Sequence, residues 1–191
     1  NGTVAARGLM NTIYHRNGVA MQEVVDVGMS LNLAWSQPLV VDIGYGKKGQ
    51  NNASDFITTY PVNGQVDLPL VMYPETPNPL PDVDLYNTDY VTKTSSPVSF
   101  YAAAGTTIIV NSFTVTQDGQ ANPLDMRLIT QANDVNKYVP SHSVHLVGKA
   151  PFRPTTKYNV SFNGTVNGKG VSKTWSFTTG NSLNIGGGAK Q

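Results

Sequence analysis

Residues 154–180 have the sequence PTTKYNVSFNGTVNGKGVSKTWSFTTG, in which two alternating segments flank a glycine-rich reversal. The alternate positions are Tyr158, Val160 and Phe162 before the reversal and Val171, Lys173, Trp175 and Phe177 after it. A period of two is that of a β-strand with one buried face. Because Asn-Gly pairs readily supply positive φ angles, we predict a hairpin that turns between Gly164 and Gly170.

This hairpin needs a second sheet, because Trp175 and Phe177 give it an apolar face. We predict that Trp175 is buried between two sheets, with the amine of Lys173 in solvent at a sheet end. Further strands are predicted at residues 66–71, 98–102, 107–117, 124–130 and 144–147. With the hairpin they make about seven, the number typical of an immunoglobulin-like sandwich.

The composition favours β-structure and excludes several partners. The chain has only two glutamates, and residues 75–82 carry three prolines within five positions, which predicts irregular backbone there. Charged residues are 13% and the net charge is +1, too little positive charge to hold nucleic acid or anionic lipid. Cysteine is absent, which excludes disulfides and thiolate metal sites. No apolar run approaches the ~20 residues of a membrane span.

The surface composition, low in Lys and Glu and rich in Thr, Ser and Asn, is typical of secreted bacterial modules. We therefore expect a secreted or cell-surface protein. The chain begins Asn1-Gly2-Thr3, without the basic and apolar regions of a signal peptide. We interpret it as an internal piece of a longer protein.

The first fifty residues predict a short helix and a second hairpin. Apolar residues within 3–20 fit one side of a helix, which Asn17-Gly18 would end. Residues 24–33 and 38–45 then predict two strands joined by a turn at 36–38. An isolated two-stranded hairpin is not stable, so its apolar faces need a cover. We predict a homodimer, or strand exchange, through residues 20–46.

The run LMNTIYHRNGVAMQEVVDVGMSLN, followed by LVVDIGYG, spans residues 9–46. It resembles the closing part of the CAP superfamily of secreted proteins, in its cysteine-free bacterial form. The matching elements are Tyr14-His15-Arg16, Val27-Gly28-Met29 and a final apolar strand that ends in glycine. The resemblance implies an α-β-α sandwich whose cleft, lined by two histidines and two acidic residues, is built largely by preceding helices. Those helices are not in this sequence, so no catalytic or metal role is implied for its residues.

Residues 59–180 resemble bacterial immunoglobulin-like and fibronectin type III domains. The segment YPVNGQVDLP at 60–69 is similar to the start of such modules, and TWSFTT at 174–179 is similar to their last strand. Residues 150–158, APFRPTTKY, resemble the lead-in to the sixth strand. In the family a tyrosine there bonds to upstream backbone, which implies a corner hydrogen bond for Tyr158.

These patterns together predict a mainly β chain. An immunoglobulin-like β-sandwich of about seven strands follows a short helix and β-hairpin, the remnant of a CAP-like α-β-α domain. The expected boundaries are 1–50 for the remnant, 51–58 for a linker, 59–180 for the sandwich and 181–191 for a flexible tail.

The histidines give one candidate binding pair. His15 and Arg16 could orient an anion, although a histidine that bonds local backbone is the favoured interpretation. His142 and His145 are three residues apart on one predicted strand and therefore point to opposite faces. They are not expected to hold a metal together.

Two further clusters are candidates for ligands. Asp82, Asp84 and Asp89 could surround Ca²⁺, with a solvated acidic loop as the alternative. Tyr86, Tyr90 and Tyr101 could stack on a sugar, with half-buried packing as the alternative. No serine lies in a recognisable nucleophile motif, and no cofactor besides the candidate calcium is predicted.

The leading hypothesis is a non-catalytic, secreted or cell-surface immunoglobulin-like accessory module attached to a CAP-like domain. It would act as a spacer or as a platform for a protein or a cell-wall glycan. One alternative is the wall of a cell-envelope enzyme whose active cleft lies upstream. Another is a carbohydrate-binding module.

Overall fold

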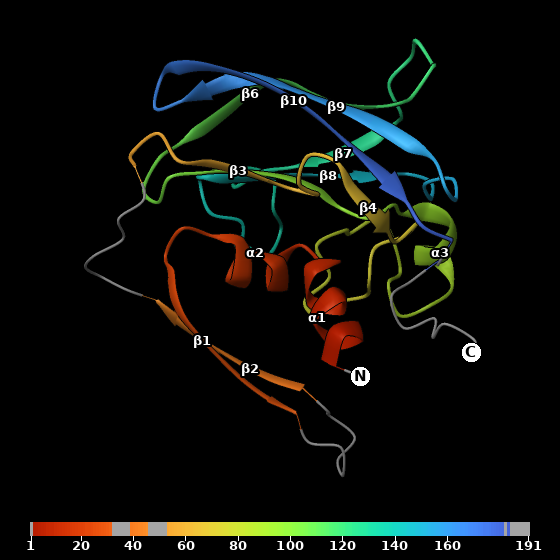
Figure 1. Ribbon diagram of the computed structural model, residues 1–191, viewed down its shortest axis with the longest axis horizontal. Helices are drawn as coiled ribbons and strands as arrows, with labels where there is room; N and C mark the ends of the chain where they lie inside the picture. Colours follow the sequence, from red (N-terminus) through yellow and green to blue (C-terminus); the bar gives the residue numbers. More distant parts are fainter. Residues whose placement is uncertain (1, 32–38, 46–52, 182, 184–191) are drawn as a thin grey trace.

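The computed structural model describes residues 2–31, 39–45, 53–181 and 183 (Figure 1). The described chain is mainly β, with two four-stranded sheets and one separate two-stranded sheet. Its helices are α1 (Gly2–Met10), α2 (Tyr14–Ala20) and α3 (Asp89–Lys93). Its strands are β1 (Val24–Leu31), β2 (Leu39–Tyr45), β3 (Ile57–Tyr60), β4 (Gln65–Leu68), β5 (Val98–Ala102), β6 (Ile108–Gln117), β7 (Met126–Ile129), β8 (Ser143–Gly148), β9 (Lys157–Val166) and β10 (Lys169–Thr179).

The predicted C-terminal hairpin is confirmed as β9 and β10. Its turn is Asn167-Gly168, with φ angles of 49° and 79°, and its register places Trp175 opposite Val160. The hairpin lies inside a sheet of order β4-β10-β9-β6, in which β4 runs parallel to β10. The second sheet has the order β3-β5-β8-β7 and is antiparallel throughout.

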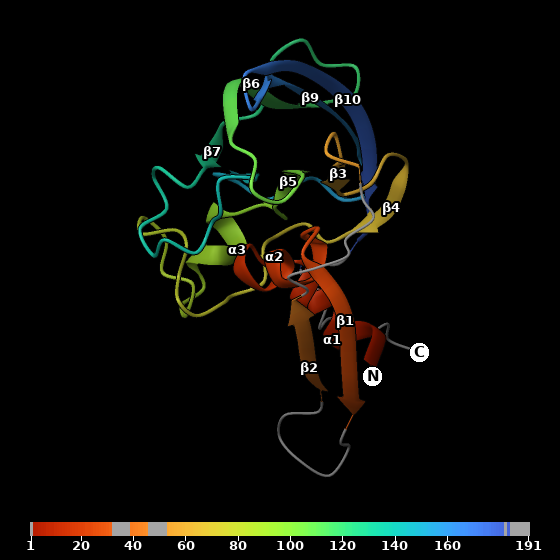
Figure 2. The same cartoon turned by 90° about the vertical axis from the view of Figure 1, so that its left-hand side faces the viewer.

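The two sheets form facing layers around one apolar core (Figures 1 and 2). Phe100 of β5 stacks on Phe162 of β9 with ring centroids 3.9 Å apart, so side chains of the two sheets meet directly. Trp175 is 4% exposed and belongs to this core. Its predicted burial between the sheets is confirmed.

The predicted corner hydrogen bond of Tyr158 is also confirmed. The backbone N–H of Arg153 donates to the Tyr158 hydroxyl oxygen over 2.8 Å, and the ring packs against Phe152 and Phe177. The tyrosine therefore ties the start of β9 to the preceding loop while its ring fills the core.

Other predicted elements are confirmed with shifted ends, and four differ. The single helix predicted within residues 3–20 is two helices, α1 and α2, which are separated at residues 11–13. Strand β3, whose first residues fall inside the expected linker, and helix α3 were not predicted. Helix α2 continues through Asn17-Gly18, where a helix end was predicted, because Asn17 is buried and the Met21 N–H donates to its carbonyl. The predicted turn at 36–38 lies outside the described residues, as does most of the tail at 181–191.

Strands β1 and β2 form the predicted N-terminal hairpin, here called the hairpin arm. The register pairs Val27 with Ile43 and Met29 with Val41. The arm points away from both four-stranded sheets (Figure 2). Val25 and Val27 are 46% and 45% exposed, so the arm presents apolar surface to solvent. Within the described ranges, no helix is long and apolar enough to cross a membrane.

Candidate functional site

Helix α2 covers the outer face of the β3-β5-β8-β7 sheet (Figure 1). The register aligns Tyr60, Ser99 and His145 in one row and Tyr101 with Ser143 in the next. Because side chains alternate between the faces of a strand, these five residues share the face opposite the apolar core. We call them the polar sheet face. Ser99, Tyr101, Ser143 and His145 are all 0% exposed, so this polar surface is fully covered.

Arg16 of α2 lies against the polar sheet face and is 0% exposed. Its Nε donates to the Met10 carbonyl over 2.6 Å, and its Nη1 donates to the Pro97 carbonyl and to Ser99 Oγ, each over 2.7 Å. The guanidinium carbon lies 4.4 Å from the centroid of the Tyr60 ring, an arrangement that stabilises a cation. Burial lowers the pKa of Arg16, yet a guanidinium remains charged in proteins.

Part of this guanidinium is unpaired. Nη2 of Arg16 has no hydrogen-bond partner, and none of the ion pairs formed by the described residues includes Arg16. A buried charge normally has a counter-ion. Arg16 is held by carbonyls, a hydroxyl and an aromatic face, and the buried carboxylate of Glu75 favours its charged form without direct contact.

Ser99 and His145 form a buried hydroxyl–imidazole pair, with 2.8 Å between Ser99 Oγ and His145 Nδ1. Burial lowers the pKa of His145 to about 3, so the ring is neutral. Arg16 also donates to Ser99 Oγ, and the direction of the Ser99–His145 hydrogen bond depends on which ring nitrogen of His145 carries the proton. The pair has the first two members of a nucleophilic triad, but neither residue is exposed to a substrate.

Glu75 provides a second anchor for α2, and its side chain is 0% exposed. Its carboxylate accepts the backbone N–H of Ile13 over 2.6 Å and of Tyr14 over 3.0 Å, and it lies 3.0 Å from Nδ1 of His15. A negative charge at the start of a helix is favourable. The hydrogen bond that the His15 ring donates to Glu75 raises the pKa of His15.

The structure thus separates the candidate pair His15 and Arg16. His15 is half exposed and pairs with Glu75, sixty residues away in sequence, instead of with local backbone alone, whereas Arg16 is buried beside Ser99. The other two histidines also have different neighbours. His142 Nε2 lies 2.9 Å from a carboxylate oxygen of Glu23, and His145 bonds to Ser99.

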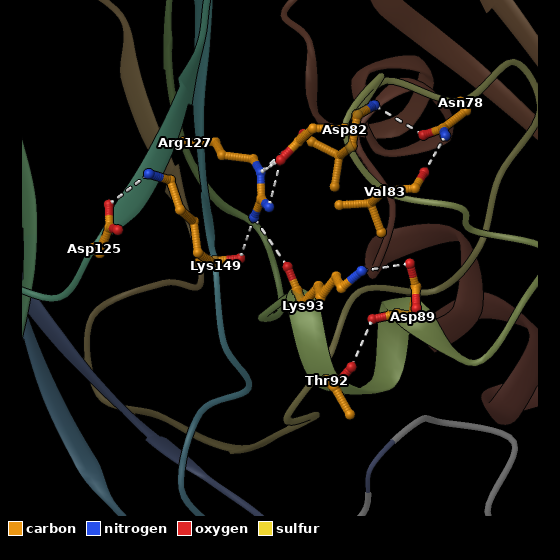
Figure 3. Close-up of polar contacts among 11 residues, drawn as sticks. Asn78, Asp82, Val83, Asp89, Thr92, Lys93, Asp125, Arg127 and Lys149 are labelled. Atoms are coloured by element: carbon orange, nitrogen blue, oxygen red, sulfur yellow. Dashed lines mark hydrogen bonds and ion pairs between the residues drawn. The ribbon is translucent and has the colours of Figure 1, made fainter.

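The three candidate calcium ligands each have another partner, and Figure 3 shows the partners of Asp82 and Asp89. Asp82 receives Arg127 in a bidentate ion pair, with Nη2 2.7 Å from Oδ2. Asp89 pairs with Lys93 over 2.7 Å. The third, Asp84, accepts the backbone N–H of Tyr86. Nowhere in the described ranges do three or more His, Cys, Asp or Glu residues lie together as metal ligands.

The Arg127 interaction ties three segments of the chain together (Figure 3). Its Nη1 also donates to the backbone carbonyls of Lys93 and Gly148, each over 2.9 Å. The hydrogen bonds from Arg127 lower the pKa of Asp82. This cluster fixes the loop before α3 to strands β7 and β8.

The candidate tyrosines differ in exposure. Tyr86 is 70% exposed, whereas Tyr90 is half-buried against the apolar core. Tyr138, which the sequence interpretation missed, is 60% exposed and packs edge-on against Tyr14 with centroids 5.3 Å apart. The loops that carry Tyr86 and Tyr138 are joined where Asn136 Nδ2 donates to the carbonyl of Asn78 over 2.7 Å.

No known family model and no curated protein matches the chain. The function is therefore argued from geometry. Tyr101, the third tyrosine predicted as a sugar-stacking candidate, is 0% exposed, so that interpretation is wrong for it. Ser99 and Glu75 were not singled out from the sequence. A signal for Ser99 is that it alternates with Val98 and Phe100 on a strand too apolar to face water.

Proposed function

We propose that the protein is a non-catalytic, secreted or cell-surface immunoglobulin-like accessory module, which holds a CAP-like N-terminal segment as a binding platform. Two features support the immunoglobulin-like assignment. The order β3-β5-β8-β7 corresponds to the ABED sheet of that fold, and β6-β9-β10 corresponds to its CFG sheet. The Tyr158 corner is a further family feature.

The observation that carries the proposal is the complete burial of Arg16 beneath α2. Separating α2 from the sheet would expose Arg16, Ser99 and the carboxylate of Glu75. It would break the hydrogen bonds of Arg16 to Pro97 and Ser99 and those that Glu75 accepts from Ile13 and Tyr14. Removing one partner from a buried charged group is strongly destabilising. The segment at residues 9–20 therefore moves with the sandwich, which favours a platform over a loose spacer.

Amide hydrogen exchange on the whole chain tests this rigid connection. We expect the amides of Asn17 and Met21 to be protected to the same order as those of the β9–β10 hairpin. Exchange at the rate of a free peptide in α2, with protection kept in β9 and β10, would contradict the platform.

The non-catalytic part of the proposal is tested on the same protein. Ester, peptide and glycan hydrolysis should not exceed the background rate, because the Ser99–His145 pair is sealed. Turnover that Ser99→Ala abolishes would support an enzyme instead. Turnover that survives this change would point to a site elsewhere in the chain.

The hairpin arm is the surface that this platform presents. Beyond residue 25, the outer edges of β1 and β2 pair with no other strand that the structure describes. Free strand edges beside exposed apolar residues promote pairing with another chain. We propose that a second copy of this chain covers the arm within residues 20–46.

Glycan binding is a second candidate, favoured by the exposure of Tyr86 and Tyr138 on joined loops. Exposed tyrosine rings offer an apolar face with a polar tip for contact with a sugar. Co-sedimentation with insoluble peptidoglycan or chitin, compared with a Tyr86→Ala/Tyr138→Ala variant, tests it. Tyr73→Ala is a matched control for the loss of an exposed tyrosine, because Tyr73 is 42% exposed.

A further inference from the structure

The hairpin arm leaves the sandwich with apolar residues in solvent (Figure 2). Within the described part of the chain, residues 25–28 belong to neither apolar core and form no hydrogen bond or ion pair with the sandwich. Burial of apolar surface is favourable, so a freely pivoting hairpin would fold back and cover Val25 and Val27 against its own sheets. Contacts at the base of the arm must hold it away from them.

Gln22 supplies the first contact at the base. It lies between the end of α2 and the start of β1 and is 7% exposed. Its Oε1 accepts the backbone N–H of Ala104 over 2.6 Å. Ala104 lies in the turn that follows β5, where the Thr106 N–H donates to the Ala103 carbonyl. Because a buried polar side chain needs a hydrogen-bond partner, Gln22 ties the base of the arm to this turn.

Glu23, the next residue, supplies the second contact. Its Oε1 lies 2.9 Å from Nε2 of His142, and the side chains of Glu23 and His142 are 28% and 7% exposed. The two groups are in ion-pair contact without the alignment of a hydrogen bond. Solvent screens a partly buried pair less than it screens an exposed one, so this contact also resists separation of the arm from the sandwich.

The two contacts grip one corner of the β3-β5-β8-β7 sheet. Ala104 follows β5 and His142 precedes β8, and these strand ends are joined where the Ala102 N–H donates to the His142 carbonyl over 2.9 Å. One contact would leave the arm free to pivot, whereas two contacts on different strands define a direction. The Met21 N–H donates to the Asn17 carbonyl over 3.2 Å, so the base also continues directly from α2.

We propose that Gln22 and Glu23 form a clamp that fixes the direction of the hairpin arm and holds its apolar residues away from the sandwich. The clamp consists of these two side chains and their partners, Ala104 and His142. The fold itself then maintains the exposure of Val27 and makes it available to another chain. The inference rests on the proposed function only for that partner, because the clamp acts within one chain.

The distance between two spin labels tests the clamp. The chain has no cysteine, so the changes Ser30→Cys on the arm and Ser161→Cys on β9 create the only label sites. Both positions are exposed. The measurement is made at a dilution where light scattering shows a monomer, so that it reports on one chain. We expect a narrow distance distribution when Gln22 and Glu23 are present, and a broad one would overturn the clamp.

Two variants remove the contacts separately. Gln22→Met keeps the length of the side chain without its amide acceptor, and Glu23→Ala removes the carboxylate. Each should broaden the distribution, and the double variant should broaden it most and shift it to shorter distances. A urea midpoint for each variant ensures that only folded protein is compared, and the single variants serve if the double variant does not fold.

Tyr158→Phe is the matched control, because it also loses a hydrogen bond but in the sandwich. Its distance distribution should equal that of the wild type. An unchanged distribution in folded protein without the clamp contacts would overturn the proposal. Light scattering at high concentration reports the dimer separately, so a wild type that stays monomeric would contradict the proposed partner and leave the distance result as it stands.

Discussion

Replacing Glu75 with alanine should release α2 from the sandwich. The carboxylate is fully buried and accepts two well-formed backbone hydrogen bonds, from Ile13 over 2.6 Å and from Tyr14 over 3.0 Å. A hydrogen bond to a charged acceptor contributes about 1.5–3 kcal/mol, so the two bonds together give ~3–6 kcal/mol. The contact to the half-exposed ring of His15 is left out of this sum because solvent screens it.

The assay is urea unfolding followed by tryptophan fluorescence, since Trp175 lies in the sandwich core. We expect Glu75→Ala to lower the free energy of unfolding by ~3–5 kcal/mol, the range for breaking a buried charged interaction. Faster amide exchange in α2 should accompany the loss. Glu75→Gln keeps one acceptor oxygen and should cost about 1–2 kcal/mol. A loss below ~1 kcal/mol for the alanine variant, with α2 still protected, would show that Glu75 does not anchor the helix.

The other predictions concern the core, the corner, pH and assembly. Trp175→Ala should cost ~3–5 kcal/mol as a large core truncation, and an unchanged urea midpoint would place the side chain outside the core. Tyr158→Phe removes one hydrogen bond and should lower the free energy of unfolding by about 1 kcal/mol. Equal stability would show that the corner hydrogen bond does not stabilise the fold. Because the pKa of His15 is raised above its usual 6.5 in the folded state, its stabilising contribution is complete below that value and is lost as pH rises through the folded pKa. Urea midpoints against pH should therefore fall less steeply over this range in His15→Gln, and parallel curves would refute the interaction. Light scattering should give a dimer for the whole chain and a monomer for the variant Val27→Lys, which places a charge on the hairpin arm. A monomeric wild type would contradict the proposed dimer.

The strands could be predicted because their information is local. The alternation around Trp175 sets the inward face of β10, and Asn167-Gly168 supplies the two positive φ angles that the turn requires. Strand β5 was predicted with its observed ends, since Ala104-Gly105 follows it at once. Helix α2 was less predictable. Tertiary burial of Asn17 carries the helix past a dipeptide that usually ends one.

The candidate site was less accessible to prediction because its residues meet only through strand pairing and helix docking. Asp82, Asp84 and Asp89 are close in sequence, yet Asp82 binds Arg127, forty-five residues away. Closeness in the sequence therefore did not bring the three carboxylates together around one site. Tyr138 was missed because nothing in its local pattern distinguishes an exposed tyrosine from a buried one.

The sequence by itself determined the mainly β class, the two hairpins, the burial of Trp175 and the corner at Tyr158. The class, the hairpins and the burial of Trp175 follow from side-chain alternation and turn chemistry, which act over a few residues. The corner at Tyr158 was implied by the resemblance of residues 150–158 to immunoglobulin-like domains. Only the tertiary structure decided the burial and the hydrogen-bond partners of Arg16 and Glu75. Apart from the Met10 carbonyl, their hydrogen-bond partners lie more than fifty residues away, and these bonds offset the cost of removing water from charges that no local pattern shows to be buried.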